Sequence, residues 1–152
     1  MHTLFVVLAG VVATAIAGTF VLSLTASRPS GLGVHNGRLS DAPSSPNCVS
    51  TYASTELHSI QPLVFEGDPA NALALVRDVL STMSRTTLVD TKPDYLHVEF
   101  RSPIFRFVDD VEFLVAPGTN QIHFRSASRT GYSDMGVNRA RMENIRKLFN
   151  SQ

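Results

Sequence analysis

The stretch Val108–Ser126, VDDVEFLVAPGTNQIHFRS, decides the fold because two alternating segments flank a turn. The turn is Pro-Gly-Thr-Asn at 117–120, a strong hairpin signal. If Pro117 lies opposite Asn120, the apolar residues Val111, Phe113, Val115, Ile122 and Phe124 share one face of the hairpin, together with Ser126. The other face then carries Asp110, Glu112, His123 and Arg125. This segregation predicts an antiparallel pair with one buried face.

Two amphipathic helices are expected around these strands. Asp68-Pro69 can cap and start a helix, and apolar residues follow it at spacings of three and four: Leu73, Val76, Leu80 and Met83. From Thr86 the period changes to two, which predicts strands at 86–90 and 95–101, and a further strand is expected at 58–65. A last helix from about Met135 to Phe149 completes an α+β fold. We expect an antiparallel sheet of about four to five strands with two helices packed on one face.

The first 27 residues contain no Asp, Glu, Lys or Arg. Residues 3–24 are an apolar run that would span roughly 33 Å as a helix, enough to cross a hydrocarbon core of about 30 Å. We therefore expect one transmembrane helix that anchors the chain. A cleaved signal peptide is the alternative, but such peptides have a positively charged start and a shorter apolar core.

Residues 25–55 are rich in Gly, Pro and Ser and are expected to form a linker that lets the domain stand off the bilayer. Leu32, Val34 and Leu39 are apolar enough to dock part of this linker on the domain. Residues 56–152 are expected to form the α+β domain. Thirteen basic residues balance thirteen acidic ones, so the charge gives no reason to expect a nucleic-acid partner. The lone Cys48 excludes an internal disulfide and a zinc site of several cysteines. Neither a metal nor a cofactor is expected.

The densest polar segment runs from Arg125 to Arg141 and links the last strand to the last helix. The residues expected to bind a ligand are Asp109, Asp110, Arg125, Ser128, Arg129, Tyr132, Asn138 and Arg139. Arginine holds planar anions through two parallel hydrogen bonds, so this composition fits an acidic ligand or a partner's carboxylate.

Two other interpretations of this segment stay open. The first is a structural ion-pair network that pins the loop, with Asp109 and Asp110 beside Arg129 and compensating the basic residues at the start of the last helix. The second is catalysis by Ser126 or Ser128, which would need a histidine and an orienting acid nearby. His97, Glu99, Glu112 and His123 could meet on the outward sheet face as metal ligands. Without the spacing of a metal motif, we interpret that face as exposed to solvent.

Three blocks of sequence carry a resemblance to a known family: Gly37-Arg-Leu39 with Ser45-Pro-Asn-Cys-Val-Ser50, then Phe107–Phe113, then Arg125–Arg139. Over residues 32–148 the chain resembles the domain of unknown function family 1499. The resemblance implies an exported or membrane-anchored protein and no particular activity. Relatives often have a second cysteine where this chain has Ala42, so any pair that it forms with Cys48 in relatives is lost here.

The side of the membrane is indicated in two ways. Arg28 and Arg38 follow the apolar segment, which by the positive-inside rule favours a cytoplasmic domain. The family resemblance implies an extracytoplasmic, periplasmic domain, and we expect the latter. Three functions are then open: an anchored domain that binds an anionic ligand or protein partner through its Arg/Asp/Tyr loop, a hydrolase or transferase acting on an anionic substrate, or an accessory subunit of a larger membrane complex.

Overall fold

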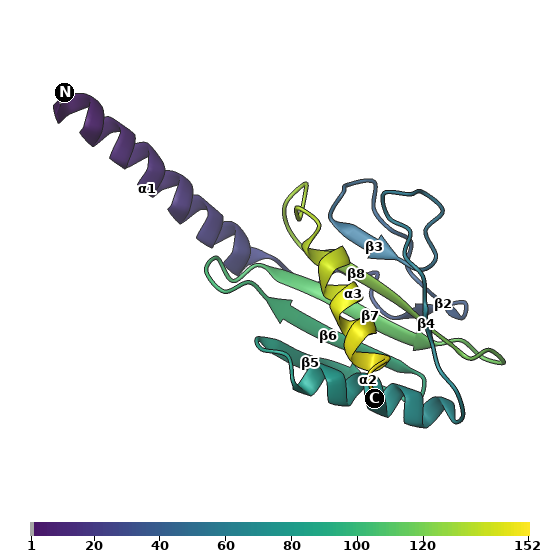
Figure 1. Cartoon of the computed structure of the whole chain (residues 1–152). Helices are drawn as coiled ribbons and strands as arrows, with labels where there is room; N and C mark the ends of the chain where they lie inside the picture. Colours follow the sequence, from purple (N-terminus) through teal and green to yellow (C-terminus); the bar gives the residue numbers. More distant parts are fainter. Residues whose placement is uncertain (1) are drawn as a thin grey trace.

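A computed structural model describes residues 2–152 and shows one long helix followed by a sheet that two helices cover (Figure 1). The long helix, α1 (His2–Thr25), projects away from the rest of the chain. The hydroxyl groups of Thr14, Thr19 and Thr25 each donate to a backbone carbonyl one turn earlier at 2.9 Å. These polar groups therefore need no water, as a membrane environment requires. The segment Leu4–Thr25 is long and apolar enough to be a membrane anchor or a signal sequence.

The main sheet has six strands, so the expectation of four to five was too low. Its strands are β3 (Cys48–Ser50), β4 (Leu63–Val64), β5 (Thr86–Thr91), β6 (Tyr95–Arg101), β7 (Val108–Val115) and β8 (Gln121–Ser128). They lie in the order β3-β8-β7-β6-β5 with antiparallel pairing, and β4 also pairs with β8. The additional strand, β3, has three residues in a segment rich in Gly, Pro and Ser, too short for its period to be recognised.

The register of the central hairpin is the one that the sequence predicts. Val111 faces Ser126, Phe113 faces Phe124 and Val115 faces Ile122 across β7 and β8. The strand expected at 58–65 was wrong for most of its length, since only Leu63 and Val64 pair with β8. Pro62 explains the short pairing because proline has no backbone N–H to donate to the ladder.

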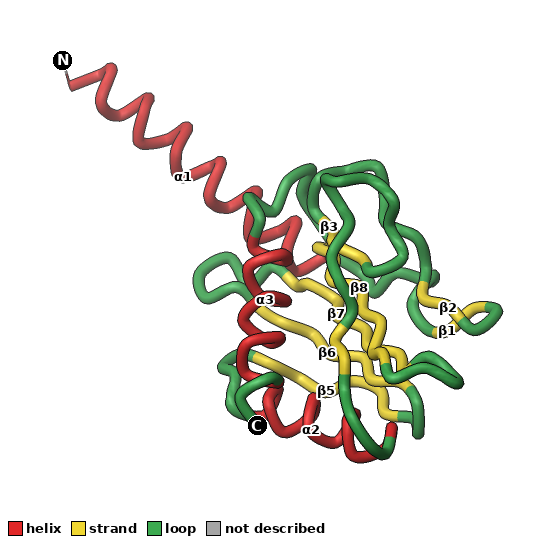
Figure 2. Tube along the Cα trace, turned by 45° about the vertical axis from the view of Figure 1, so that its right-hand side comes forward, coloured by secondary structure: helices red, strands yellow, loops and turns green. Residues whose placement is uncertain are grey.

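The helices α2 (Pro69–Ser81) and α3 (Val137–Phe149) cover one face of the sheet (Figure 2). Their apolar sides bury the central hairpin, and the core includes Leu73, Val76, Leu80, Phe113, Phe124, Met142 and Ile145. α3 begins at Val137 and not at the expected Met135. Met135 has a φ of 54° and Gly136 a φ of 81°, which are left-handed conformations that a right-handed helix cannot include.

The segment expected to be a linker, residues 25–55, contains three strands. These are β1 (Val34–His35) and β2 (Arg38–Leu39), which form a small sheet of their own, and β3 of the main sheet. Leu39 packs against Tyr95 and Leu114 in a second apolar cluster, separate from the core beneath the helices. Both faces of the main sheet are therefore covered, one by helices and the other by this irregular segment.

Candidate functional site

Alternation along β6 and β7 places three carboxylates on the sheet face turned away from the helices. Glu99, Asp110 and Glu112 are at most 3% exposed, so the expectation of a solvent-exposed face was wrong. They lie beneath residues 28–47, which we call the covering segment. Burying three carboxylates is costly unless each one is paired.

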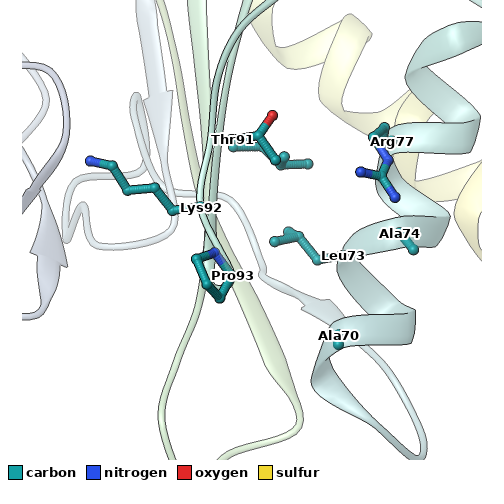
Figure 3. A pocket seen from close by; sticks show the side chains of 8 residues that line it. Ala70, Leu73, Ala74, Arg77, Thr91, Lys92 and Pro93 are labelled. Atoms are coloured by element: carbon teal, nitrogen blue, oxygen red, sulfur yellow. The ribbon is translucent and has the colours of Figure 1, made fainter.

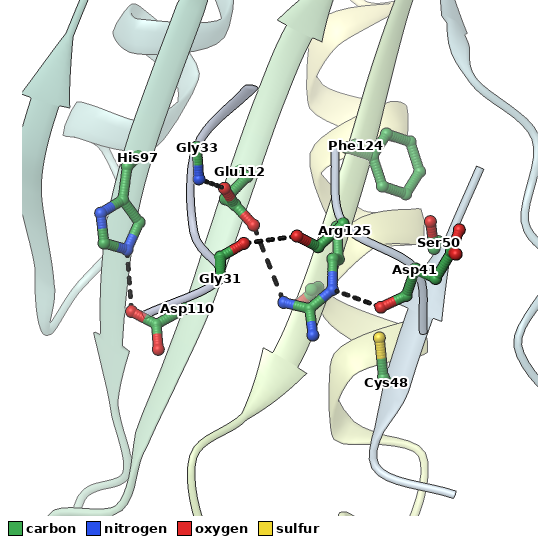
Figure 4. Close-up of polar contacts among 12 residues, drawn as sticks. Gly31, Gly33, Asp41, Cys48, Ser50, His97, Asp110, Glu112, Phe124 and Arg125 are labelled. Carbon is green, nitrogen blue, oxygen red and sulfur yellow. Dashed lines mark hydrogen bonds and ion pairs between the residues drawn. The ribbon is translucent and has the colours of Figure 1, made fainter. Parts of the chain in front are cut away.

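Glu112 fixes the covering segment to the sheet (Figure 4). Its Oε1 accepts the backbone N–H of Gly33 at 2.6 Å and the hydroxyl of Tyr95 at 2.8 Å. Gly33 has a φ of 106°, a conformation that favours glycine. The other oxygen, Oε2, is buried and has no hydrogen-bond partner among the described residues.

Arg129 is the centre of an ion cluster on the same face. Its Nε and Nη2 donate to the two oxygens of Asp110, each at 2.7 Å, which is the bidentate geometry that favours arginine over lysine. Nη2 also reaches Glu99 Oε1. Glu99 accepts further hydrogen bonds from Arg28 at 2.7 Å and Arg101 at 2.8 Å. The cluster therefore joins β6, β7, the end of β8 and the covering segment.

The ion pairs set the protonation of these carboxyls. Burial alone would raise the pKa of Asp110, but the hydrogen bonds from Arg129 and His97 outweigh burial and hold that pKa below its ordinary value. Burial would also raise the pKa of Glu99, but the hydrogen bonds from Arg28 and Arg129 outweigh it, so this pKa is lowered as well. The hydrogen bond to Asp110 raises the pKa of Arg129. The cluster is thus ionised at neutral pH.

Arg125 differs from Arg129 in having no close partner. Its Nη1 lies 3.7 Å from Glu112 Oε2, and its Nε lies 3.4 Å from the backbone carbonyl of Asp41 (Figure 4). Both separations are longer than an ordinary charge-assisted hydrogen bond. The side chain is nevertheless 12% exposed and thus largely removed from water. The guanidinium group of Arg125 therefore has N–H donors that are available to a ligand.

Arg125 lines a pocket with a volume of about 330 Å³ between the covering segment and β8. Four of the residues predicted to bind a ligand meet there: Asp110, Arg125, Ser128 and Arg129. Pro29, Asn47 and Gly131 contribute to its wall. The charged residues of the pocket wall are two arginines, Arg125 and Arg129, and one carboxylate, Asp110, which Arg129 already pairs.

Asp109 and Asn138 belong to a separate network on the helix side of the sheet. Asp109 accepts from the Ser128 hydroxyl at 2.5 Å and pairs with Arg141 of α3. Asn138 is fully buried, accepts from Ser126 at 2.6 Å and donates to the backbone carbonyl of Asn47 at 3.0 Å. The expectation that an internal acid compensates the arginines at the start of this helix is confirmed for Arg141. This network joins α3 to β7 and β8.

The structure does not bring Tyr132 and Arg139 to the pocket. The side chain of Tyr132 is exposed at the surface. Arg139 donates to the backbone carbonyls of Leu57 at 3.1 Å and Glu56 at 3.4 Å. The eight residues predicted as one site therefore occupy the pocket, the helix-side network and the surface.

Sequence reasoning did not include Arg28, Tyr95 and Arg141 among the site residues, and it considered Glu99 and Glu112 only as possible metal ligands. A signal existed for Glu99, because the alternation of Tyr95, His97, Glu99 and Arg101 places them all on one face of β6. Arg28 had none, since it contacts a residue 71 positions away through an irregular segment.

Comparison with known families identifies the family of the chain. The family described as "Protein of unknown function (DUF1499)" matches residues 38–149. The chain belongs to this family. The DUF1499 region contains the pocket residues of β7 and β8 and the helix-side network, while α1 and Arg28 lie before it. A search of curated proteins found no significant match.

The two serines considered as nucleophiles make structural contacts. The hydroxyls of Ser126 and Ser128 donate to Asn138 and Asp109. His123 bonds to Thr51 at 3.0 Å and stacks on a tyrosine ring. Burial raises the pKa of the Cys48 thiol to about 11, so it stays protonated at neutral pH. Among residues 2–152, no three His, Cys, Asp or Glu side chains are grouped to hold a metal ion.

Another pocket lies between α2 and the turn that joins β5 to β6 (Figure 3). Apolar and small residues such as Ala70, Leu73 and Pro93 form most of its wall. Its charged side chains, Arg77 and Lys92, belong to exposed residues. It contains none of the residues predicted to bind a ligand, so the Arg125 pocket remains the better candidate.

Proposed function

We propose that this chain is a membrane-anchored domain that binds a carboxylate-bearing ligand, either a small molecule or an acidic group of a protein partner, in the Arg125 pocket. The observation that carries the proposal is Arg125 itself, a largely buried guanidinium whose nearest polar contacts are 3.4 and 3.7 Å long. A carboxylate could accept two parallel hydrogen bonds from such a group. Two arginines against one carboxylate in the pocket wall favour an anion there.

The pocket has the size and setting for such a ligand. A volume of about 330 Å³ holds a small organic acid or the end of an acidic side chain. Arg129 supports the site from one side by keeping Asp110 ionised and fully paired, which leaves Arg125 as the available donor. The apolar helix α1 supports the anchoring part of the proposal.

Replacing Arg125 tests the binding site. With acetate and succinate as probes, the full chain in lipid nanodiscs is expected to bind in a calorimetric titration, and Arg125→Gln to bind roughly 10- to 100-fold more weakly. Arg125→Lys should bind with an intermediate affinity, because lysine keeps the charge but cannot donate two parallel hydrogen bonds. Arg77→Gln, an exposed arginine on α2, is the matched control and should bind like the parent. Equal binding by the parent and Arg125→Gln would refute the site.

The proposal also places the domain outside the cytoplasm. Its support is the family resemblance, which outweighs the two arginines after the apolar segment. A reporter that is active only in the cytoplasm, fused after Gln152, is therefore expected to stay silent. A reporter that works only outside the cytoplasm is the matched control and should be active. The reverse pattern would place the domain in the cytoplasm.

A further inference from the structure

The loop between β6 and β7, residues 102–107, presents apolar side chains beside the end of α1. Its sequence is Ser-Pro-Ile-Phe-Arg-Phe, and Ile104 is 68% exposed. The Phe105 ring lies edge-on to the ring of Phe20 in α1, with centroids 5.6 Å apart. The loop therefore continues the apolar surface of α1 onto the domain.

The depth of this contact follows from helix geometry. Phe20 precedes the last residue of α1, Thr25, by five positions, so it lies about 7.5 Å below that end at a rise of about 1.5 Å per residue. Amphipathic elements that rest on membranes bury their apolar side about 5–10 Å into the boundary between headgroups and acyl chains. If α1 crosses the bilayer, its contact with Phe20 puts Phe105 at this depth.

The connection between α1 and the domain is too short for the domain to stand off the bilayer. Arg28 is bonded to Glu99 at 2.7 Å, and only two residues separate it from Thr25. Three fully extended residues reach at most about 11 Å. Ser23 in the last turn of α1 is also buried, although most of the helix is exposed. The loop thus stays at the membrane surface while this pair is formed.

Basic side chains lie in and beside this loop. Arg106 is an exposed residue of the loop, and Arg101 directly precedes it with its side chain 36% exposed. Arg28 is 53% exposed at the end of the anchor. Guanidinium groups beside an apolar tip are the combination that binds the headgroup region of a bilayer.

We infer that the 102–107 loop is a membrane-docking element, in which Ile104 and Phe105 enter the leaflet that α1 crosses and Arg101 and Arg106 bind lipid phosphates. The inference rests on the anchoring part of the proposed function and is independent of the Arg125 pocket. The bilayer would hold the domain in one orientation, with the sheet end that carries this loop facing the lipid.

The single cysteine makes the depth of the loop measurable. Cys48 is buried and its thiol stays protonated, so a thiol-reactive fluorophore is expected to label an introduced Ile104→Cys selectively. Val64→Cys is the matched control, because Val64 is similarly exposed at 63%. It lies at the other end of the sheet, beside the turn that follows β7, roughly 25 Å away along an eight-residue strand. The unsubstituted chain gives the background labelling.

The full chain is reconstituted into vesicles whose acyl chains carry a nitroxide quencher. The label at residue 104 is expected to be quenched several-fold more than the label at residue 64, and flotation should recover both proteins with the vesicles. Equal quenching of the two labels in floated protein would overturn the docking loop while leaving the anchor intact. A blue-shifted but unquenched label at 104 would show that protein covers the loop, which also overturns the inference. Failure to float would refute the anchor and the loop together.

Discussion

Arg129→Ala is expected to lower the free energy of unfolding by roughly 3–5 kcal/mol, because it leaves two buried carboxylates without their main partner. Asp110 loses both hydrogen bonds of its bidentate pair, and Glu99 keeps only Arg28 and Arg101. Denaturant unfolding of the full chain measures the change. Arg77→Ala, at an exposed position of α2, should change stability by about 0.5 kcal/mol or less. A loss below about 1 kcal/mol for Arg129→Ala would show that the cluster contributes little.

The same cluster predicts how stability depends on pH. The pKa values of Asp110 and Glu99 are lowered in the folded chain, from ordinary values of 3.8 and 4.5. The unfolded chain therefore takes up protons at a higher pH than the folded chain. The stability that these groups provide is present above about pH 4.5 and is lost as the pH falls through the folded pKa values. In Arg129→Ala this acid-dependent loss should be smaller, which separates loss of the ion pairs from a general packing defect.

Glu112→Leu is expected to cost about 2–6 kcal/mol and to release the covering segment. The substitution keeps a similar volume but leaves the Tyr95 hydroxyl and the Gly33 N–H without their acceptor, at about 1–3 kcal/mol for each buried group. Hydrogen exchange should report the release as faster exchange in residues 31–40 with little change in β7 and β8. Glu66→Leu, at an exposed position, is the control. Unchanged exchange at Gly33 would show that other contacts hold the segment.

The central hairpin and its register could be predicted because the information is local. Alternation over Val108–Ser126 and the Pro-Gly turn determine which side chains face each other, and this register correctly brought Asp110 beside Arg129. The helix spanning Pro69–Ser81 was predictable from its cap and apolar stripe. These features depend on neighbours in sequence, so one sequence suffices.

The covered face could be predicted only in part, because its cover contains few apolar residues. Docking of Leu39 was predictable and is confirmed, but Leu39 is the only buried residue of β1 and β2. Other contacts of the cover are polar, such as the hydrogen bond from Gly33 to Glu112. Polar contacts over this sequence distance leave no periodic pattern. The sequence therefore indicated charged residues on an outward face. In the structure these residues form a buried cluster, and Arg125 is the one arginine in it with only long polar contacts to the described residues. The division of Asp109 and Asp110 between two faces was predictable, but their different partners were not.

The ion pair between Arg28 and Glu99 determines which shortened forms of the chain keep the buried carboxylates covered. Both Arg28 and Gly33 precede the first residue that matches the family. A fragment starting at Arg38 would therefore contain the matched region without the complete covering segment. Glu99 would lose one cation and Glu112 one donor, and both would meet water. A peptidase that removed α1 by cutting after Ser27 would have the opposite effect. It would leave Arg28 as the new first residue, so the released domain would keep the ion pair with Glu99 and the whole covering segment.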